Sequence, residues 1–188
     1  VRWGADFCRV CVEAERRDGT HEVDIAIPLA GRRKIRVNGS EIARSGELMG
    51  HVTGVLFSPE DLRLIKDGPG ERRRFMDIAL SQIRPSYYYA LQRYARALKQ
   101  RNELLRTGRL ETLDSWDEQL CREGTRIMAA RADYIERLNE AAARTHGDIA
   151  REREKLSIAY APNVADGDLR AALLRTRDGD ARRMTTSA

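Results

Sequence analysis

The sequence has few aromatic residues, no long apolar segment and no recognisable leader. Only 6% of its 188 residues are aromatic, which argues against a sandwich packed around aromatic side chains. No run approaches the roughly 18 apolar residues that a membrane helix needs. The first residues lack the basic, apolar and small-residue order of a signal peptide. Together these absences predict a cytoplasmic protein without a membrane segment.

Cysteine and histidine are also scarce, at three residues each. Cys8 and Cys11 have the spacing of a metal-binding or redox pair, but no second pair accompanies them. Residues three apart in a strand also face opposite sides, so these two thiols are poorly placed to share a ligand. We therefore predict reduced thiols, including Cys121, and no metal site.

The motifs that usually mark an active site are missing. No Gly-x-x-x-x-Gly-Lys-Ser/Thr loop is present to hold phosphates, and no apolar run ends in paired carboxylates that could bind magnesium. Asp114, Asp117 and Glu118 cluster where a helix is expected to begin, a position that favours acids. The sequence thus predicts no catalytic, nucleotide-binding or metal-binding residue, and we expect this chain alone neither to bind nor to hydrolyse ATP.

The net charge of +5 conceals two segments of opposite sign. Residues 63–109 contain twelve basic and four acidic side chains, a net of +8, whereas residues 110–154 contain seven and eleven, a net of −4. Two interpretations stay open. Antiparallel helices neutralise each other along their shared edges, or a residual basic face meets nucleic acid.

The first third of the chain has the alternating pattern of β-strands. Apolar and polar residues alternate over 7–13 and 21–29, a short strand is expected at 34–37, and turn signals separate the three. This pattern predicts an antiparallel meander with one buried face. A short helix over 40–51 and a buried strand over Val52–Phe57 are expected to follow.

The rest of the chain is dominated by helical periodicity. Ser58-Pro59 starts a short helix that ends at Asp67-Gly68, and Pro69 starts the next. Three- and four-residue apolar steps then predict longer helices. The expected elements are helices over 69–83, 85–107 and about 113–142, a strand over 156–161, a short helix over 168–176, a turn at 178–180, and an exit over 184–188 toward a further strand.

Two motifs carry a resemblance to a known family. Pro59-Glu60-Asp61-Leu62 and Leu64-Ile65 are followed by Gly-Pro-x-x-Arg-Arg-x-Phe-x-Asp over 68–77, and this resembles the first motif of the RecF family of DNA replication and repair proteins. Tyr94 and the stretch from Leu98 to Leu105 resemble a second family segment. The resemblance implies the head of an ABC-type ATPase that requires ATP and Mg²⁺ in the full-length protein.

The resemblance also implies an α+β fold. Residues 1–58 would be antiparallel strands from the edge of lobe I, 59–155 a helical lobe II with a long antiparallel helix pair, and 156–188 the return to lobe I. The family's Walker A motif would precede residue 1, and its signature and Walker B motifs would follow Ala188. We therefore expect an internal fragment. Residues 55–60 occupy the place of the family's Q-loop but contain no glutamine, so they are given no role.

The function implied by the resemblance is DNA replication and recombinational repair, including the SOS response. Family members bind DNA in an ATP-dependent way at single-strand gaps in duplex DNA, form ATP-dependent homodimers, and act with RecO and RecR to load recombinase. The alternative is a non-enzymatic helical adaptor that uses the helix pair over 85–145 to bind a protein.

Four basic residues are candidate DNA contacts: Arg72, Arg73, Lys99 and Arg101. Other roles remain open for each. The arginines at 72–74 could form ion pairs within the helix, for instance with Asp77, and the polar side chains at 99–102 could satisfy neighbouring helix ends. Tyr87, Tyr88 and Tyr89 are expected mainly in the core, with stacking on single-stranded bases as the alternative.

Overall fold

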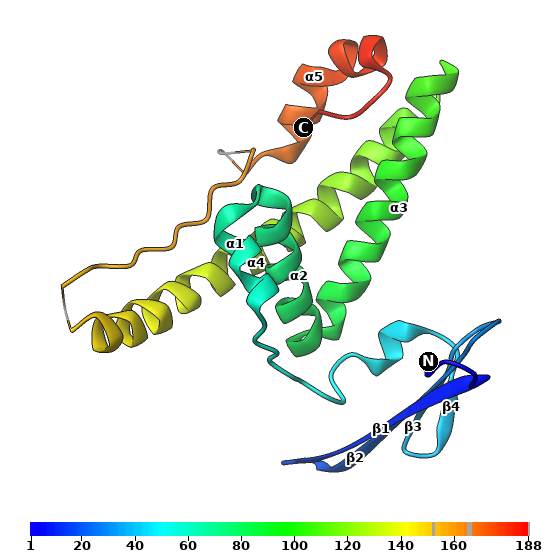
Figure 1. Cartoon of the computed structure of the whole chain (residues 1–188). Coiled ribbons are helices and arrows are strands. Elements are labelled where there is room, and N and C mark those ends of the chain that lie inside the picture. The colour runs from blue at the N-terminus through cyan, green and yellow to red at the C-terminus, as the bar shows by residue number, and fades with distance from the viewer. Residues whose placement is uncertain (152, 165–166, 188) are drawn as a thin grey trace. The chain divides into compact units, whose positions relative to one another are not determined.

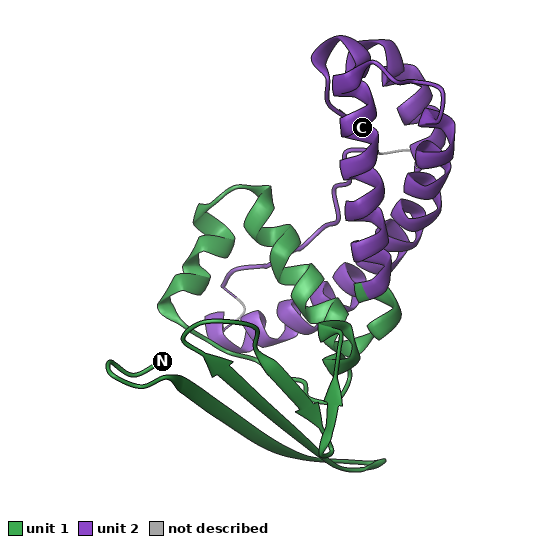
Figure 2. Ribbon diagram, turned by 90° about the vertical axis from the view of Figure 1, so that its right-hand side faces the viewer, with its two compact units in different colours: residues 1–88 green, residues 89–188 purple. Residues whose placement is uncertain are grey.

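The computed structural model describes residues 1–151, 153–164 and 167–187. The chain divides into two compact units, Val1–Tyr88 and Tyr89–Ala188, which Figure 2 distinguishes by colour. The described strands and the helices up to residue 83 lie in the first unit, and the second holds most of the helix that begins at Pro85 and both later helices (Figure 1). None of the described helices is both long enough and apolar enough to cross a bilayer.

The first unit contains a four-stranded antiparallel sheet in the order β1-β2-β3-β4. Its strands are β1 (Phe7–Arg16), β2 (Gly19–Pro28), β3 (Lys34–Val37) and β4 (Ser40–Ile42). Asn38 and Gly39 connect β3 to β4 with φ angles of 49° and 79°, the positive values that a tight two-residue hairpin turn requires. The predicted meander is confirmed, with β4 as an additional strand.

One face of the sheet collects the apolar side chains of β1 and β2. Val10 pairs with Ile25 and Val12 with Val23, so these four lie on the same face. Val23 is buried at 4% exposure, whereas Val10 retains 49%. The alternation was therefore predicted correctly, but the described residues cover this face only in part.

Two predictions for residues 40–57 were wrong. The expected helix over 40–51 is replaced by β4 and a single 3-10 turn, η1 (Ser45–Leu48). The expected buried strand over 52–57 has no regular structure, and Val55, Leu56 and Phe57 are 85–101% exposed. An apolar run forms a strand only beside a partner strand, and no described strand pairs with this one.

The helical part of the first unit begins with η2 (Pro59–Leu62) and α1 (Arg63–Lys66), followed by α2 (Pro69–Ile83). The Ser58 backbone N–H donates to the Asp61 carboxylate at 2.7 Å, and this closes the first turn of η2. The predicted starts at Pro59 and Pro69 are both confirmed. Met76 and Leu80 are the buried apolar residues of α2.

The second unit is built on α3 (Pro85–Thr107), α4 (Leu113–Ala150) and α5 (Leu169–Arg183). With 38 residues, α4 is about 57 Å long at 1.5 Å per residue. The hydrophobic core of the second unit joins Ala97 of α3 and Leu120 of α4 to Val164 and to three residues of α5, namely Leu169, Ala172 and Leu173. Helix α4 and helix α5 thus share one core, and the predicted long helices are confirmed.

Predictions for residues 156–188 were less accurate. Residues 156–161 have no regular structure, although a strand was expected. Helix α5 begins at Leu169, with the Asp168 carboxylate accepting from the Ala171 N–H at 2.9 Å, but it continues through the turn expected at 178–180. The predicted exit toward a strand runs through Ala188, which lies outside the described residues.

Candidate nucleic-acid interface

Arg72 has a structural role at the start of α2. Its Nη1 donates to the Leu64 carbonyl at 3.1 Å and to the Asp67 carbonyl at 2.9 Å. These carbonyls lie at the C-terminal end of α1, where unpaired carbonyl oxygens favour a cation. The guanidinium therefore fastens α1 to α2, which explains a cation in the first turn of a helix.

Arg73 is exposed on α2 and is available to a ligand. Asp77, the partner considered from the sequence, accepts a hydrogen bond from the Tyr87 hydroxyl at 2.5 Å. Tyr87 is buried at 4% exposure, which confirms its expected place in the core.

Lys99 and Arg101 lie two residues apart on α3 in opposite environments. Lys99 is exposed, whereas Arg101 is fully buried at 0% exposure. The Arg101 guanidinium donates to Asp117 at 2.6 Å, to Asp180 at 2.8 Å and to the Thr186 hydroxyl at 2.8 Å. Arg101 is therefore not a surface DNA contact in this structure, because its charge is enclosed by α4, α5 and the residues after α5.

The carboxylate of Asp180 is the centre of this enclosed network. It also accepts from the Ser187 hydroxyl at 2.6 Å and from the Thr176 hydroxyl at 3.2 Å. Burial alone would raise the pKa of Asp180, but the hydrogen bonds from Ser187 and Arg101 and the Arg101 charge outweigh it and lower the pKa. Asp180 thus remains ionised and holds the segment after α5 against α3.

The sequence contained one signal of this burial. Tyr94, Leu98, Arg101 and Leu105 are spaced four, three and four residues apart, so Arg101 occupies an apolar position of the α3 seam. The pattern alone does not reveal a buried ion pair, because the partner Asp180 lies 79 residues from Arg101 in the sequence. Asp117 was assigned to a helix start and Asp180 to a turn, and neither was recognised as a buried partner.

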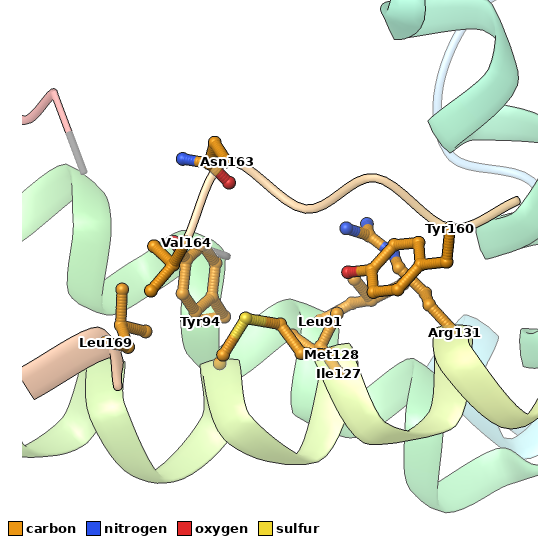
Figure 3. Close-up of a pocket in the computed structure, with 10 residues that line it drawn as sticks. Leu91, Tyr94, Ile127, Met128, Arg131, Tyr160, Asn163, Val164 and Leu169 are labelled. Atoms are coloured by element: carbon orange, nitrogen blue, oxygen red, sulfur yellow. The ribbon is translucent and has the colours of Figure 1, made fainter. Parts of the chain in front are cut away.

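A small pocket lies between α3, α4 and the segment before α5 (Figure 3). Its volume is about 100 Å³. Tyr94, Val164 and Leu169 line one end, and Figure 3 shows Arg131 and Tyr160 together at the other. Ligand sites for cofactors and drug-sized molecules have volumes of about 300–1,000 Å³, so this pocket is too small for a nucleotide.

Over residues 1–151, 153–164 and 167–187, no group of three histidine, cysteine or carboxylate side chains is placed to hold a metal ion. Cys8, Cys11 and Cys121 are free thiols. Burial raises the pKa of Cys121, which opposes the reactive thiolate form.

Curated relatives give a consistent description of the chain, although no family model matches it. It is 38% identical over 165 residues to the DNA replication and repair protein RecF of Acetivibrio thermocellus, covering 85% of this chain and 45% of the relative. The RecF protein of Agathobacter rectalis is 35% identical, with coverages of 96% and 51%. For that of Clostridium botulinum, the identity is 36% and the coverages are 100% and 54%.

Solved structures agree with these relatives. A structure of the recombination mediator protein RecF with ATP, from the RecFOR pathway, matches the whole chain with a TM-score of 0.84 at 27% identity. The match covers 54% of that protein. The chain spans about half the length of the curated relatives it matches. With RecF relatives over its whole length and the same arrangement of strands and helices, this chain belongs to the RecF family of DNA replication and repair proteins.

Proposed function

We propose that this chain supplies the helical lobe and the adjoining strands of a DNA-binding repair ATPase. The observation that supports the proposal most is the likeness to RecF relatives and RecF structures over essentially the whole chain. In this proposal residues 1–58 and 156–188 belong to lobe I, and residues 59–155 form lobe II. ATP and Mg²⁺ would be bound by the full-length protein.

The proposed activity is cytoplasmic DNA repair. The full-length protein would bind single-stranded and gapped duplex DNA in an ATP-dependent way, form an ATP-dependent homodimer, and act with RecO and RecR to load recombinase. The basic segment over 63–109 supports the DNA-binding part of this proposal, because a net charge of +8 attracts phosphates without reading sequence.

Arg73 and Lys99 are the proposed backbone contacts on this segment, because both side chains are exposed. Arg72 is a weaker candidate, because its guanidinium already satisfies the end of α1. A phosphate contact contributes affinity that depends on salt, with a slope in log K against log salt of about 0.9 per contact.

The test is fluorescence anisotropy of a gapped duplex titrated with the chain at several salt concentrations. Non-specific binding with a dissociation constant of about 10⁻⁴–10⁻⁶ M is expected. Arg73→Gln and Lys99→Gln should each weaken binding and lower the salt slope by about one. Arg72→Gln should instead lower the melting temperature. Absence of DNA binding by the unaltered chain at low salt would refute the proposal.

A further inference from the structure

Three arginines from two helices converge on one buried carboxylate in the second unit. Arg93 of α3 reaches Glu123 of α4 at 2.9 Å. From α4 itself, Arg122 approaches the same carboxylate at 3.2 Å and Arg126 at 3.6 Å. We name these four residues the Glu123 cluster: Arg93, Arg122, Glu123 and Arg126.

The cluster is buried on its acidic side and open on its basic side. The Glu123 side chain is 1% exposed, whereas those of Arg93, Arg122 and Arg126 are 47%, 54% and 63% exposed. Each guanidinium has five N–H donors, and one carboxylate accepts about four hydrogen bonds in all. Most of the donors are therefore left facing solvent.

The charges do not balance within the cluster. Three guanidinium groups and one carboxylate leave a net charge of +2, and the exposed Glu118, one turn before Arg122, reduces it at most to +1. Arg122 and Arg126 are also four residues apart on one helix, an arrangement in which like charges repel. An excess of cations held together in this way favours an anionic ligand.

Glu123 keeps the arginines in place at neutral pH. The hydrogen bond from Arg93 is the main cause that lowers the pKa of Glu123, and it outweighs the opposing effect of burial. The carboxylate thus stays ionised and fixes one end of each guanidinium. A ligand that binds the solvent-facing N–H groups of these guanidinium groups therefore costs less side-chain entropy than one that binds unrestrained arginines.

We propose that the Glu123 cluster is a second phosphodiester-binding site for the DNA backbone, separate from Arg73 and Lys99. Guanidinium groups match the paired oxygens of a phosphate better than ammonium groups do, and fixed arginines orient a nucleic-acid strand without reading its sequence. This inference rests on the proposed function, because it takes DNA as the ligand from the family of the chain.

The deciding variant is Arg122→Gln with Arg126→Gln, since both side chains are on the surface of α4 and Arg93 continues to join the helices. The matched control is Arg137→Gln with Arg144→Gln, which removes the same charge from exposed positions farther along α4. DNA affinity is measured by anisotropy over a salt series. Thermal unfolding of every variant is followed in parallel.

The cluster variant should lose about two units of salt slope, which corresponds to two phosphate contacts, and the control should lose less than one. Glu123→Gln removes the buried negative charge that pairs with the arginines and raises the net charge by one, so it should lower the melting temperature without weakening DNA binding. Polyglutamate at the same charge concentration should compete poorly, because carboxylates of a flexible chain lack the regular spacing of phosphates.

The possible contrary results are distinct. Equal losses in the cluster variant and its control would overturn this site and leave the proposed function intact. Competition by polyglutamate as strong as by DNA would identify an acidic protein partner and overturn the assignment to phosphodiesters. A chain that binds no DNA at any salt concentration would overturn both the site and the proposed function.

Discussion

Arg101 shows how the environment of one residue decides its role. Its side chain is enclosed with the carboxylates of Asp117 and Asp180, at 2.6 Å and 2.8 Å. Removing one member of such a buried group leaves charges without compensation, which costs about 3–5 kcal/mol. We expect Arg101→Ala to lower the free energy of unfolding by this amount in a urea titration followed by circular dichroism.

Lys99→Ala is the matched control for Arg101, because Lys99 is exposed on the same helix. Its free energy of unfolding should stay within about 0.5 kcal/mol of the unaltered chain. If Arg101→Ala proved as stable as this control, the enclosed network would not contribute to the fold as described. The two variants also separate stability from DNA binding, since only Lys99 is a proposed phosphate contact.

Gly124 is the second residue whose neighbours decide its effect. A Cβ atom at this position in α4 would overlap Leu169 Cδ2 and would lie 3.1 Å from Tyr94 Cε2. Alanine stabilises a helix interior by about 1 kcal/mol relative to glycine, but overpacking a core costs about 1–3 kcal/mol. Gly124→Ala should therefore lower the melting temperature, measured by calorimetry, despite its helix propensity.

Gly70→Ala provides the comparison for Gly124, because a Cβ at Gly70 in α2 would meet nothing within 4 Å. This substitution should be neutral or slightly stabilising. A melting temperature raised by both substitutions would mean that α4 moves away from α5 without cost, contrary to the close approach seen at Leu169.

At the scale of elements, the sequence predicted helices better than isolated strands. The bounds of α2 and the start of α3 follow from Pro69 and Pro85, because proline at the first helical position marks a start locally. The strand expected over 52–57 could not be verified locally, because strand formation depends on a neighbouring strand. Helix α5 runs through Gly179 because Asp180 gains a hydrogen bond from the distant Arg101, which local turn signals do not reveal.

Residues of the candidate interface were likewise predicted where local signals suffice and missed where their partners are distant in the sequence. The exposed positions of Arg73 and Lys99 follow from a basic segment beside an apolar seam, which the sequence displays. The burial of Arg101 was not predicted because its partners come from other helices. The Glu123 cluster was missed for the same reason, since Arg93 and Glu123 are 30 residues apart and meet only when α3 packs on α4.

The attachment of α5 should depend on pH. The pKa of Asp180 is lowered in the folded chain, as is that of Glu123 between α3 and α4. A carboxylate with a lowered pKa contributes stability above its unfolded pKa of about 4 and loses that contribution as the pH falls further. The free energy of unfolding should therefore decrease between about pH 5 and pH 2 in urea titrations.

Asp180→Asn tests whether this carboxylate causes part of the pH dependence. The variant should be less stable than the unaltered chain at pH 7, and its stability should change less between about pH 5 and pH 2, because one shifted group is gone. A pH profile with the same slope in both proteins would show that Asp180 is not among the groups responsible.

At the scale of the whole molecule, apolar surface is left uncovered over residues 55–57. Val55, Leu56 and Phe57 are 101%, 85% and 90% exposed. The chain spans about half the length of the curated relatives it matches. Val55→Ser with Phe57→Ser should change the free energy of unfolding by less than about 0.5 kcal/mol, because exposed side chains contribute little to stability.

The same double variant should bind less of a dye that reports exposed apolar surface, such as 8-anilinonaphthalene-1-sulfonate. The reason is that it replaces two exposed apolar side chains with polar ones. Val23→Ser, in contrast, introduces a hydroxyl at a position that is 4% exposed and should be strongly destabilising. A large loss of stability from the 55–57 variant would show that this segment is packed in solution.

Nucleotide binding is the property that this chain is expected to lack when isolated. Phosphate-loop and magnesium-carboxylate groups provide most of the contacts to ATP in such ATPases, and neither motif occurs in the sequence. The pocket between α3, α4 and the segment before α5, of about 100 Å³, is too small for a nucleotide. Isothermal calorimetry with ATP and Mg²⁺ should therefore detect no micromolar binding, with buffer alone as the control. A micromolar dissociation constant would contradict this expectation and would require a nucleotide site built from residues 1–188 alone.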